Sequence, residues 1–333
     1  MMQSDSLFRP AWWLNNPHLQ TLYPTFLRKS VPPSVKRERL FTPDGDFFDI
    51  DWCEEGGRYL VILLHGLSGS TQSGYIKGLQ HALLLHGISS VAMNFRGCGG
   101  EPNRLARCYH SGDTDDIHFL YQTLRQRLPQ TALAAVGFSL GGNVLLKWLG
   151  EQGDNLALFA AVAVSVPLVL SVCATKMDSG FSRVYRDRLL SELKHFIRAK
   201  HRHLVRMGQF EEADKLEALG DLSKIRSFWQ YDDRVVAPLH GFKDVEDYYR
   251  RASSRQFLKH ISVPTLLIQA DDDPFMTNAV LPIEEELSAR VSLEIIKGGG
   301  HVGFISGRNP FKPSYWLDQR IPTFLKALVD SAQ

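Results

Sequence analysis

Short apolar segments alternate with amphipathic segments along most of the chain, and this alternation constrains the fold more than any other feature. The apolar segments have the length of strands, and the segments between them carry apolar residues at helical spacing. Because parallel strands need a crossover, usually a helix, the alternation predicts a mostly parallel central sheet flanked by helices, the doubly wound α/β class. The predicted strands are residues 46–52, 59–65, 89–95, 131–137, 158–166, 263–270 and 291–297. The predicted helices are residues 75–86, 113–128 and 281–289, one that follows Ser139 and ends near Gly150, and one that ends near Val329.

Residues 167–260 interrupt this alternation with mostly helical, highly charged sequence. We expect one domain, residues 1–333, in which this insertion forms a helical cap or lid, since such lids gate apolar substrates. Residues 183–206 of the insertion carry eight Lys or Arg and two acids, which we interpret as a solvated helix face rather than a membrane contact. The aromatic-rich residues 1–36 are predicted to form an N-terminal arm that packs on the core. The apolar face of the first predicted helix of the insertion consists of Leu189, Leu190, Leu193, Phe196 and Ile197.

The composition excludes several classes of protein. With 44% apolar residues, 22% charged residues and a net charge of +2, neither wholesale disorder nor nucleic-acid binding is expected. The apolar run 156–172 is short for a membrane span and contains Ser165 and Pro167, so it is interpreted as a buried strand followed by a loop. The four cysteines lack C-x-x-C spacing and the N-terminus lacks the layout of a secretory signal, which favours reduced thiols in a cytoplasm.

A glycine-rich turn, "VGFSLGGN", carries a single serine between a predicted strand and a predicted helix. Gly137, Ser139 and Gly141 fit G-x-S-x-G, the sharp turn that exposes a nucleophilic serine. A β-carbon at either glycine would crowd neighbouring backbone, and the serine itself must adopt an uncommon backbone conformation. The pattern favours Ser139 as a nucleophile, and the alternative is an ordinary polar residue in a turn.

A serine nucleophile needs a histidine to take its proton and a carboxylate to orient that histidine. In an α/β fold of this kind the acid and then the histidine follow the serine along the chain. Asp271, Asp272 and Asp273 come directly after a predicted strand, and His301 follows the next strand across three glycines. The spacing predicts a triad with Ser139 but does not distinguish the three aspartates.

Ester chemistry at this serine also requires donors for the oxyanion of the tetrahedral intermediate. The Leu140 N–H, at the start of the helix after Ser139, is one candidate. The second is the Leu67 N–H, in the "HGLSGS" loop after an earlier strand. His65 in the same loop is expected to brace the loop rather than to transfer protons.

Several other polar residues have simpler structural interpretations. Arg96 could shape the oxyanion loop or bind an anion, but a structural arginine in a glycine turn is favoured. His110 and Asp115 fit the H-x-x-x-x-D pattern of acyltransferases. About one match to this pattern is expected by chance in a chain of this length and composition. We instead expect Ser111 or the nearby aspartates to cap the following helix. His201 and His203 lack further ligands at a recognisable spacing, so neither a metal nor another cofactor is expected.

The chain resembles the α/β-hydrolase superfamily, and within it AB hydrolase family 4, which includes YheT-like bacterial hydrolases. The resemblance covers nearly the whole chain, and its most specific marks are "NNPHLQTLYP", "HGLSGS", "NFRGCGGEPN", "YHSGDTDD", "GFSLGGN", "GFSRVY", "DDPFM" and "GGHVGF". It implies a triad of Ser139, Asp273 and His301, because the acid of the family directly precedes Pro-Phe. It also implies hydrolysis of a small-molecule or lipid carboxylic ester, with acyl transfer through the same triad or a non-catalytic scaffold as the alternatives.

Overall fold

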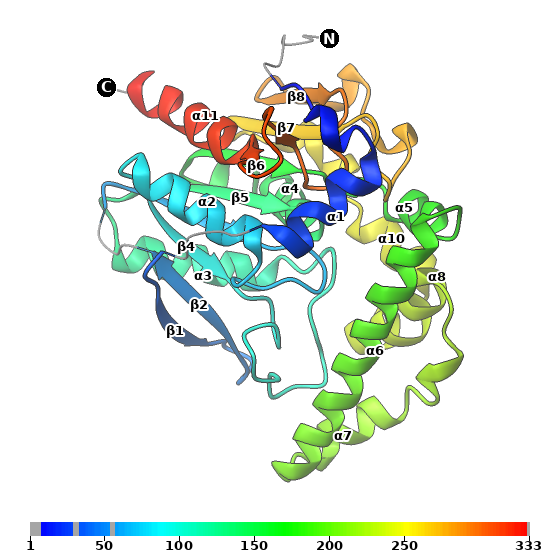
Figure 1. The fold of residues 1–333 in the computed structure, drawn as a ribbon. Helices are drawn as coiled ribbons and strands as arrows, with labels where there is room; N and C mark the ends of the chain where they lie inside the picture. The colour runs from blue at the N-terminus through cyan, green and yellow to red at the C-terminus, as the bar shows by residue number, and fades with distance from the viewer. Residues whose placement is uncertain (1–7, 29–32, 54–56, 332–333) are drawn as a thin grey trace.

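An eight-stranded sheet forms the centre of the computed structural model, which describes residues 8–28, 33–53 and 57–331 (Figure 1). The strands lie in the order β1-β2-β4-β3-β5-β6-β7-β8; β1 and β2 are antiparallel to their neighbours, and the other six strands run parallel. This confirms the predicted mostly parallel sheet. The strands are β1 Lys36–Phe41, β2 Phe47–Cys53, β3 Tyr59–Leu64, β4 Ser89–Met93, β5 Ala132–Phe138, β6 Leu158–Val164, β7 Thr265–Ala270 and β8 Val291–Ile296.

Helices cover both faces of the sheet, which is why β3, β5 and β6 are almost continuously apolar. Along β3, Ile62 and Leu64 belong to the core beneath α3 (Asp115–Arg127) and α4 (Leu140–Gln152). The alternate residues Val61 and Leu63 belong to a second core, beneath α2 (Gly74–Leu85) and α11 (Leu317–Ser331) (Figure 1). The strand period of two residues therefore divides one apolar run between two cores.

Residues 156–172 form the buried strand β6 and a turn before α5 (Leu170–Met177), as predicted. None of the helices in the described residues combines the length and apolar character needed to cross a bilayer. The predicted helix over residues 281–289 is wrong, because this segment contains only a single 3-10 turn, Glu284–Glu286, after the turn Asn278–Val280. Pro282 accounts for Leu281, which has ψ 135°, because a proline disfavours the helical region for the residue before it. Ile283 and Leu287 are extended as well, with ψ 164° and 141°, so only one 3-10 turn forms between them.

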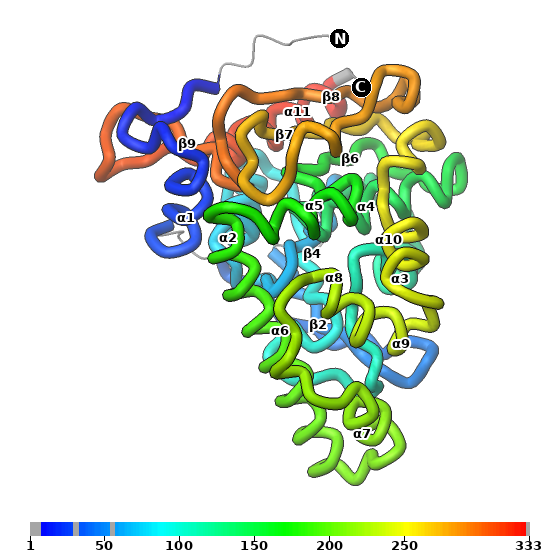
Figure 2. Tube along the Cα trace, turned by 90° about the vertical axis from the view of Figure 1, so that its right-hand side faces the viewer, coloured from blue at the N-terminus to red at the C-terminus, as the bar shows by residue number. Residues whose placement is uncertain are grey.

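The segment between β6 and β7, residues 167–260, is helical and has a hydrophobic core of its own; we call it the cap. The long helix α6 runs beside the sheet, and α6 and α7 extend beyond it (Figures 1 and 2). Leu190, Leu193 and Ile197 of α6 are buried in the cap core. The elements of the cap after α5 are α6 Ser182–Arg206, α7 Phe210–Glu217, η3 Leu222–Lys224, α8 Phe228–Tyr231, the π-helical turn η4 Asp232–Val236, α9 Ala237–His240, α10 Val245–Ala252 and η5 Arg255–His260.

The described part of the predicted arm contains η1 (Trp12–Leu14) and α1 (Pro17–Leu27). This part packs on the chain that follows β8, beside the short pair β9 (Ile305–Ser306) and β10 (Ser314–Tyr315) (Figure 2). The Ala11 N–H donates to the Ile305 carbonyl at 3.0 Å, and the buried Gln20 side chain donates to the same carbonyl at 3.0 Å. Residues 1–7 and 29–32 of the arm lie outside the described residues.

Candidate active site

Ser139 occupies the sharp turn between β5 and α4, with φ 51° and ψ −119°. Its N–H donates to the Val164 carbonyl of β6 at 2.8 Å, which holds the turn against the sheet. The flanking glycines are required sterically: a β-carbon on Gly141 would lie 2.5 Å from the His65 carbonyl oxygen, and one on Gly137 would collide with the Gly141 backbone. The local sequence thus permits a conformation that presents the serine at the carboxyl edge of the sheet.

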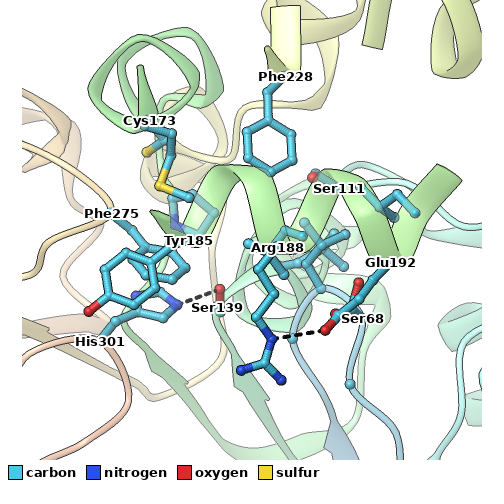
Figure 3. A pocket seen from close by; sticks show the side chains of 18 of the residues that line it. Ser68, Ser111, Ser139, Cys173, Tyr185, Arg188, Glu192, Phe228, Phe275 and His301 are labelled. Carbon is cyan, nitrogen blue, oxygen red and sulfur yellow. Dashed lines mark hydrogen bonds and ion pairs between the residues drawn. The ribbon is translucent and has the colours of Figure 1, made fainter. Parts of the chain in front are cut away.

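The structure brings Ser139, His301 and Asp273 into one hydrogen-bonded chain, of which Figure 3 shows the contact between Ser139 and His301. His301 Nε2 lies 2.9 Å from Ser139 Oγ, and His301 Nδ1 lies 2.7 Å from Asp273 Oδ2. The Asp273 carboxylate also accepts a hydrogen bond from the Phe275 N–H at 2.8 Å, which fixes its orientation. This is the geometry in which a histidine can take a proton from the serine while a carboxylate holds the correct tautomer.

The three neighbouring aspartates make different contacts, so the geometry distinguishes what the spacing could not. Asp271 accepts from the Gly298 N–H at 2.8 Å, and Asp272 accepts from the Gly300 N–H at 2.9 Å. Both contacts hold the glycine-rich loop that carries His301. Only Asp273, among the three, reaches the imidazole.

Two further groups hold His301 in place, and the sequence patterns did not point to either of them. The His301 N–H donates to the hydroxyl of Thr21 at 2.9 Å, although Thr21 lies 280 positions earlier, in α1. The Phe275 ring stacks on the imidazole with centroids 4.0 Å apart and an interplanar angle of 6°. The arm and the loop after β7 therefore both position this side chain.

The proposed oxyanion donors, the Leu67 and Leu140 N–H groups, both belong to residues that line the cavity beside Ser139. Neither donates to an acceptor within the described part of the chain. His65 braces the Leu67 loop, because its Nδ1 lies 2.7 Å from the Gly66 carbonyl oxygen and its Nε2 accepts from the Phe95 N–H at 3.2 Å. Burial lowers the pKa of His65 to about 4, which keeps the imidazole neutral, as this pair of contacts requires.

A cavity of about 790 Å³ opens over Ser139 and His301, a size in the usual range for a small ligand. Its walls are largely apolar and come from the cap, through residues such as Leu170, Leu193 and Phe228; Figure 3 labels Phe228. The arm contributes as well, through α1 residues within or next to the "NNPHLQTLYP" segment. These are Thr21, Leu22, Pro24 and Thr25.

Comparison with known proteins assigns this chain to a family. A family model described as alpha/beta hydrolase fold matches residues 59–308. The chain belongs to the α/β-hydrolase family. It is similar to the Escherichia coli (strain K12) protein named "Putative esterase YheT", with 39% identity over 340 residues that cover 98% of this chain and 95% of that protein. The resemblance inferred from the sequence, including its YheT-like branch, is thereby confirmed.

More distant relatives extend the likeness of this α/β-hydrolase. The Mus musculus protein named "Phospholipase ABHD3" is 28% identical over 333 residues, which cover 97% of this chain and 79% of that protein. The solved structure of the Pyrococcus furiosus esterase Pf2001 matches with a TM-score of 0.54 at 18% identity, covering 88% of this chain and 92% of that one. The structural match shows the shared fold.

Arg96 of this α/β-hydrolase is structural, as the favoured interpretation stated. Its guanidinium is buried and makes two hydrogen bonds to the Asp116 carboxylate, at 2.7 and 2.8 Å. It also contacts Asp44 at 2.7 Å and Asp46 at 3.2 Å. A buried arginine with three carboxylate partners ties the β1–β2 turn to α3, which is a structural role.

The predicted helix caps are wrong. The N-cap residue of α3 is Thr114, whose side chain makes no capping hydrogen bond, and Asp115 is the exposed first residue of the helix. Asp113 instead accepts hydrogen bonds from the Arg107 guanidinium at 3.1 and 3.2 Å in the interior. The carboxylate close to His110 is therefore that of Asp113, and the H-x-x-x-x-D pattern does not describe a histidine–aspartate pair in space.

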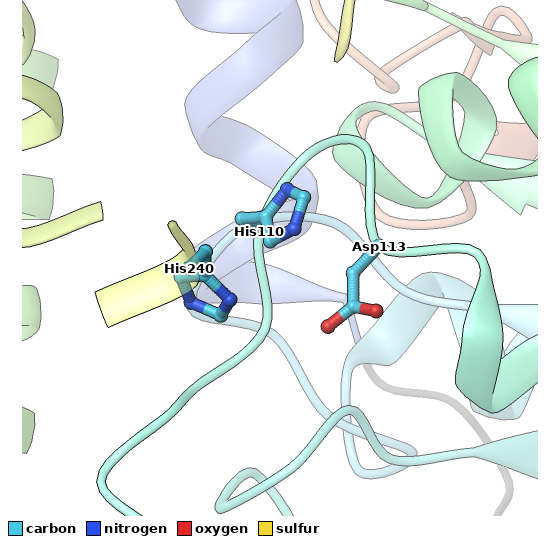
Figure 4. A group of neighbouring side chains, drawn as sticks. All are labelled: His110, Asp113 and His240. Atoms are coloured by element: carbon cyan, nitrogen blue, oxygen red, sulfur yellow. The ribbon is translucent and has the colours of Figure 1, made fainter. Parts of the chain in front are cut away.

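Among the described residues, one cluster offers ligand atoms close enough to hold a metal ion: His110, Asp113 and His240, within 4.8 Å of one another (Figure 4). Burial, followed by the positive charges of Arg107 and Lys147, lowers the pKa of His110 to about 3. The same positive charges repel a divalent cation, and Arg107 already occupies the Asp113 carboxylate. The electrostatics of this cluster thus disfavour a metal ion.

Proposed function

We propose that this α/β-hydrolase is a serine esterase that cleaves carboxylic esters through a triad of Ser139, His301 and Asp273. The observation that carries the proposal is the continuous hydrogen-bonded chain from the Asp273 carboxylate through His301 to the Ser139 hydroxyl. The names of the relatives, an esterase and a phospholipase, support the class of reaction. We also propose that the enzyme is located in the cytoplasm, which the cysteine spacing favours.

In this mechanism Ser139 Oγ attacks the ester carbonyl while His301 Nε2 takes its proton. The Leu67 and Leu140 N–H groups stabilise the oxyanion, and Leu140 adds the positive end of the α4 dipole. His301 then gives the proton to the departing alcohol, which leaves an acyl group on Ser139. Water, activated by His301, attacks this acyl-enzyme and releases the acid. Asp273 keeps its charge throughout and stabilises the imidazolium.

We further propose that the chain is a single domain with an N-terminal arm and a helical insertion, the cap. The cap acts as a lid over the site. The apolar cavity walls from α5, α6 and α8 support a substrate with an apolar chain, such as a lipid ester. A panel of p-nitrophenyl esters of increasing chain length tests this proposal. We expect kcat/KM to rise with chain length from acetate, and a sharp preference for acetate would contradict the lid.

Labelling with a fluorophosphonate probe tests the esterase directly. We expect wild type to be labelled and Ser139→Ala to remain unlabelled, because only a serine activated by a histidine attacks the probe rapidly. Circular dichroism of both proteins controls for folding. A folded wild type that remains unlabelled would refute the proposal and favour a non-catalytic scaffold. Product analysis with added alcohols then separates hydrolysis from acyl transfer.

A further inference from the structure

Polar side chains of the cap lie within the largely apolar wall of the cavity. Helix α8, the π-helical turn η4 and α9 follow one another without a break over residues 228–240. Single π-helical turns occur often at functional sites. The residues of this run that line the cavity recur in adjacent pairs four positions apart, as one face of a helix does. They are Tyr231, Asp232, Val235, Val236, Leu239 and His240, and Phe228 lines the cavity one turn before the first pair.

The carboxyl group of Asp232 has one satisfied oxygen and one unsatisfied oxygen. Oδ2 accepts a hydrogen bond from the Tyr249 hydroxyl at 2.6 Å, while Oδ1 has no partner within the described residues. Four side-chain atoms in the described residues are both inaccessible to solvent and without a hydrogen-bond partner, and Asp232 Oδ1 is not among them. It therefore keeps accessible surface, and Asp232 lines the cavity. An unsatisfied carboxyl oxygen is thus available to a ligand in the cavity.

The hydroxyl of the neighbouring Tyr231 is also unsatisfied and accessible. Its side chain is buried, its hydroxyl has no hydrogen-bond partner in the described part of the chain, and that hydroxyl is not among the inaccessible unsatisfied atoms. Tyr231 lines the same cavity as Ser139. Asp232 and Tyr231, consecutive in the chain, therefore bring a carboxyl oxygen and a hydroxyl to the same cavity; we call them the polar pair.

A wholly apolar chain in this cavity would displace water from the polar pair and leave both groups unsatisfied, which is costly in a buried site. A ligand hydroxyl would satisfy both, because it donates one hydrogen bond and accepts others. Burial raises the pKa of Asp232 to about 7, so near neutral pH this carboxyl group is present in both its protonated and its ionised form. A hydroxyl suits both forms, whereas a second carboxylate would be repelled by the ionised one.

We propose that the cavity binds an ester whose chain carries a hydroxyl group away from the scissile carbonyl, and that Asp232 and Tyr231 bind this hydroxyl. The inference rests on the proposed ester hydrolysis, because it names the class of ester that the site takes. Asp232 and Tyr231 are then residues that determine specificity, while the chemistry remains with Ser139 and His301.

The test compares p-nitrophenyl hexanoate, octanoate and decanoate with their ω-hydroxy analogues. The measured ratio is kcat/KM of the ω-hydroxy ester divided by kcat/KM of the plain ester of the same length. For the chain that reaches the polar pair, we expect a ratio of about ten, as one hydrogen bond to a buried charged group would give. We expect this ratio to fall to near one in Asp232→Leu and to fall partly in Tyr231→Phe, which removes a single oxygen. Leu239→Met, on the same helix face, is the matched control and should keep the ratio.

Three results would overturn the proposal. The first is a ratio near one at every chain length in wild type, and the second is a ratio that both Asp232→Leu and Tyr231→Phe leave unchanged. The third is a stronger preference for ω-ammonium esters, which would assign the subsite to a cation. Fluorophosphonate labelling separates the two proposals: a labelled enzyme that hydrolyses plain octanoate without hydroxyl preference retains the esterase and loses the polar subsite. If Asp232→Leu does not fold, Tyr231→Phe carries the test alone, and a ratio that Tyr231→Phe leaves unchanged overturns the proposal.

Discussion

Three consecutive aspartates after β7 show that position, not chemistry, decides the role of a residue. Asp271 and Asp272 accept from backbone N–H groups of the loop that carries His301, and Asp273 alone contacts the imidazole. An asparagine oxygen can replace a carboxylate as an acceptor for a backbone N–H. The same replacement beside an imidazole permits the wrong tautomer.

We therefore expect Asp273→Asn to lower kcat by about 10³- to 10⁴-fold on a p-nitrophenyl ester. The matched change Asp271→Asn should cost less than about tenfold, because the Gly298 N–H keeps an acceptor. Steady-state kinetics of both variants, with melting temperatures to check the fold, measure the difference. Equal losses in the two variants would contradict the assigned roles.

At the scale of elements, local pattern predicts strands and long helices well and short irregular segments poorly. The apolar face of α6 is buried as its spacing predicts, with Leu190 and Ile197 in the cap core. Residues 281–289 show the opposite, because the backbone is extended at Leu281, Ile283 and Leu287 despite several residues with helical preference. The polar pair belongs to a third kind of element, a helix with a π-helical turn that no simple period describes.

Asp232 in that turn makes the stability of the cap depend on pH. Its pKa is raised to about 7 in the folded protein by burial. Between about pH 4 and pH 7 the folded state holds a proton that the unfolded state has released, so the free energy of unfolding falls as pH rises. We expect urea unfolding to show wild type losing about 1–3 kcal/mol more than Asp232→Asn across this window. Asp233→Asn, its exposed neighbour, should behave like wild type, and an identical pH profile for wild type and Asp232→Asn would contradict the assignment.

At the scale of the whole molecule, the start of the chain completes the site near its end. Gln20 of α1 bonds the backbone of Ile305, and the adjacent Thr21 accepts from the His301 N–H. The cap closes the same site from the other side through the cavity wall. The candidate site is thus assembled from the sheet, the cap and the arm together.

Thr21→Val tests this long-range support. The change removes the acceptor of the His301 N–H and keeps the shape of the side chain, so we expect kcat to fall about 10- to 100-fold with little change in KM. Thr21→Ser restores the hydroxyl and should recover most of the activity, which a merely structural role for the methyl group would not permit. Wild-type kcat in a folded Thr21→Val protein would show that the contact does not position His301.

The sequence by itself determined the α/β class, the turn at Ser139 and the chain order of serine, acid and histidine. These features depend on residues close together in the chain: strand and helix periods, and glycines that leave room for neighbouring backbone. Spacing left three aspartates open and the family resemblance implied Asp273, whereas only the tertiary structure decided that Thr21 supports His301 and that Asp232 lines the cavity. Those contacts join residues that are far apart in the chain or turned toward the same space by packing, and no local period encodes such a meeting.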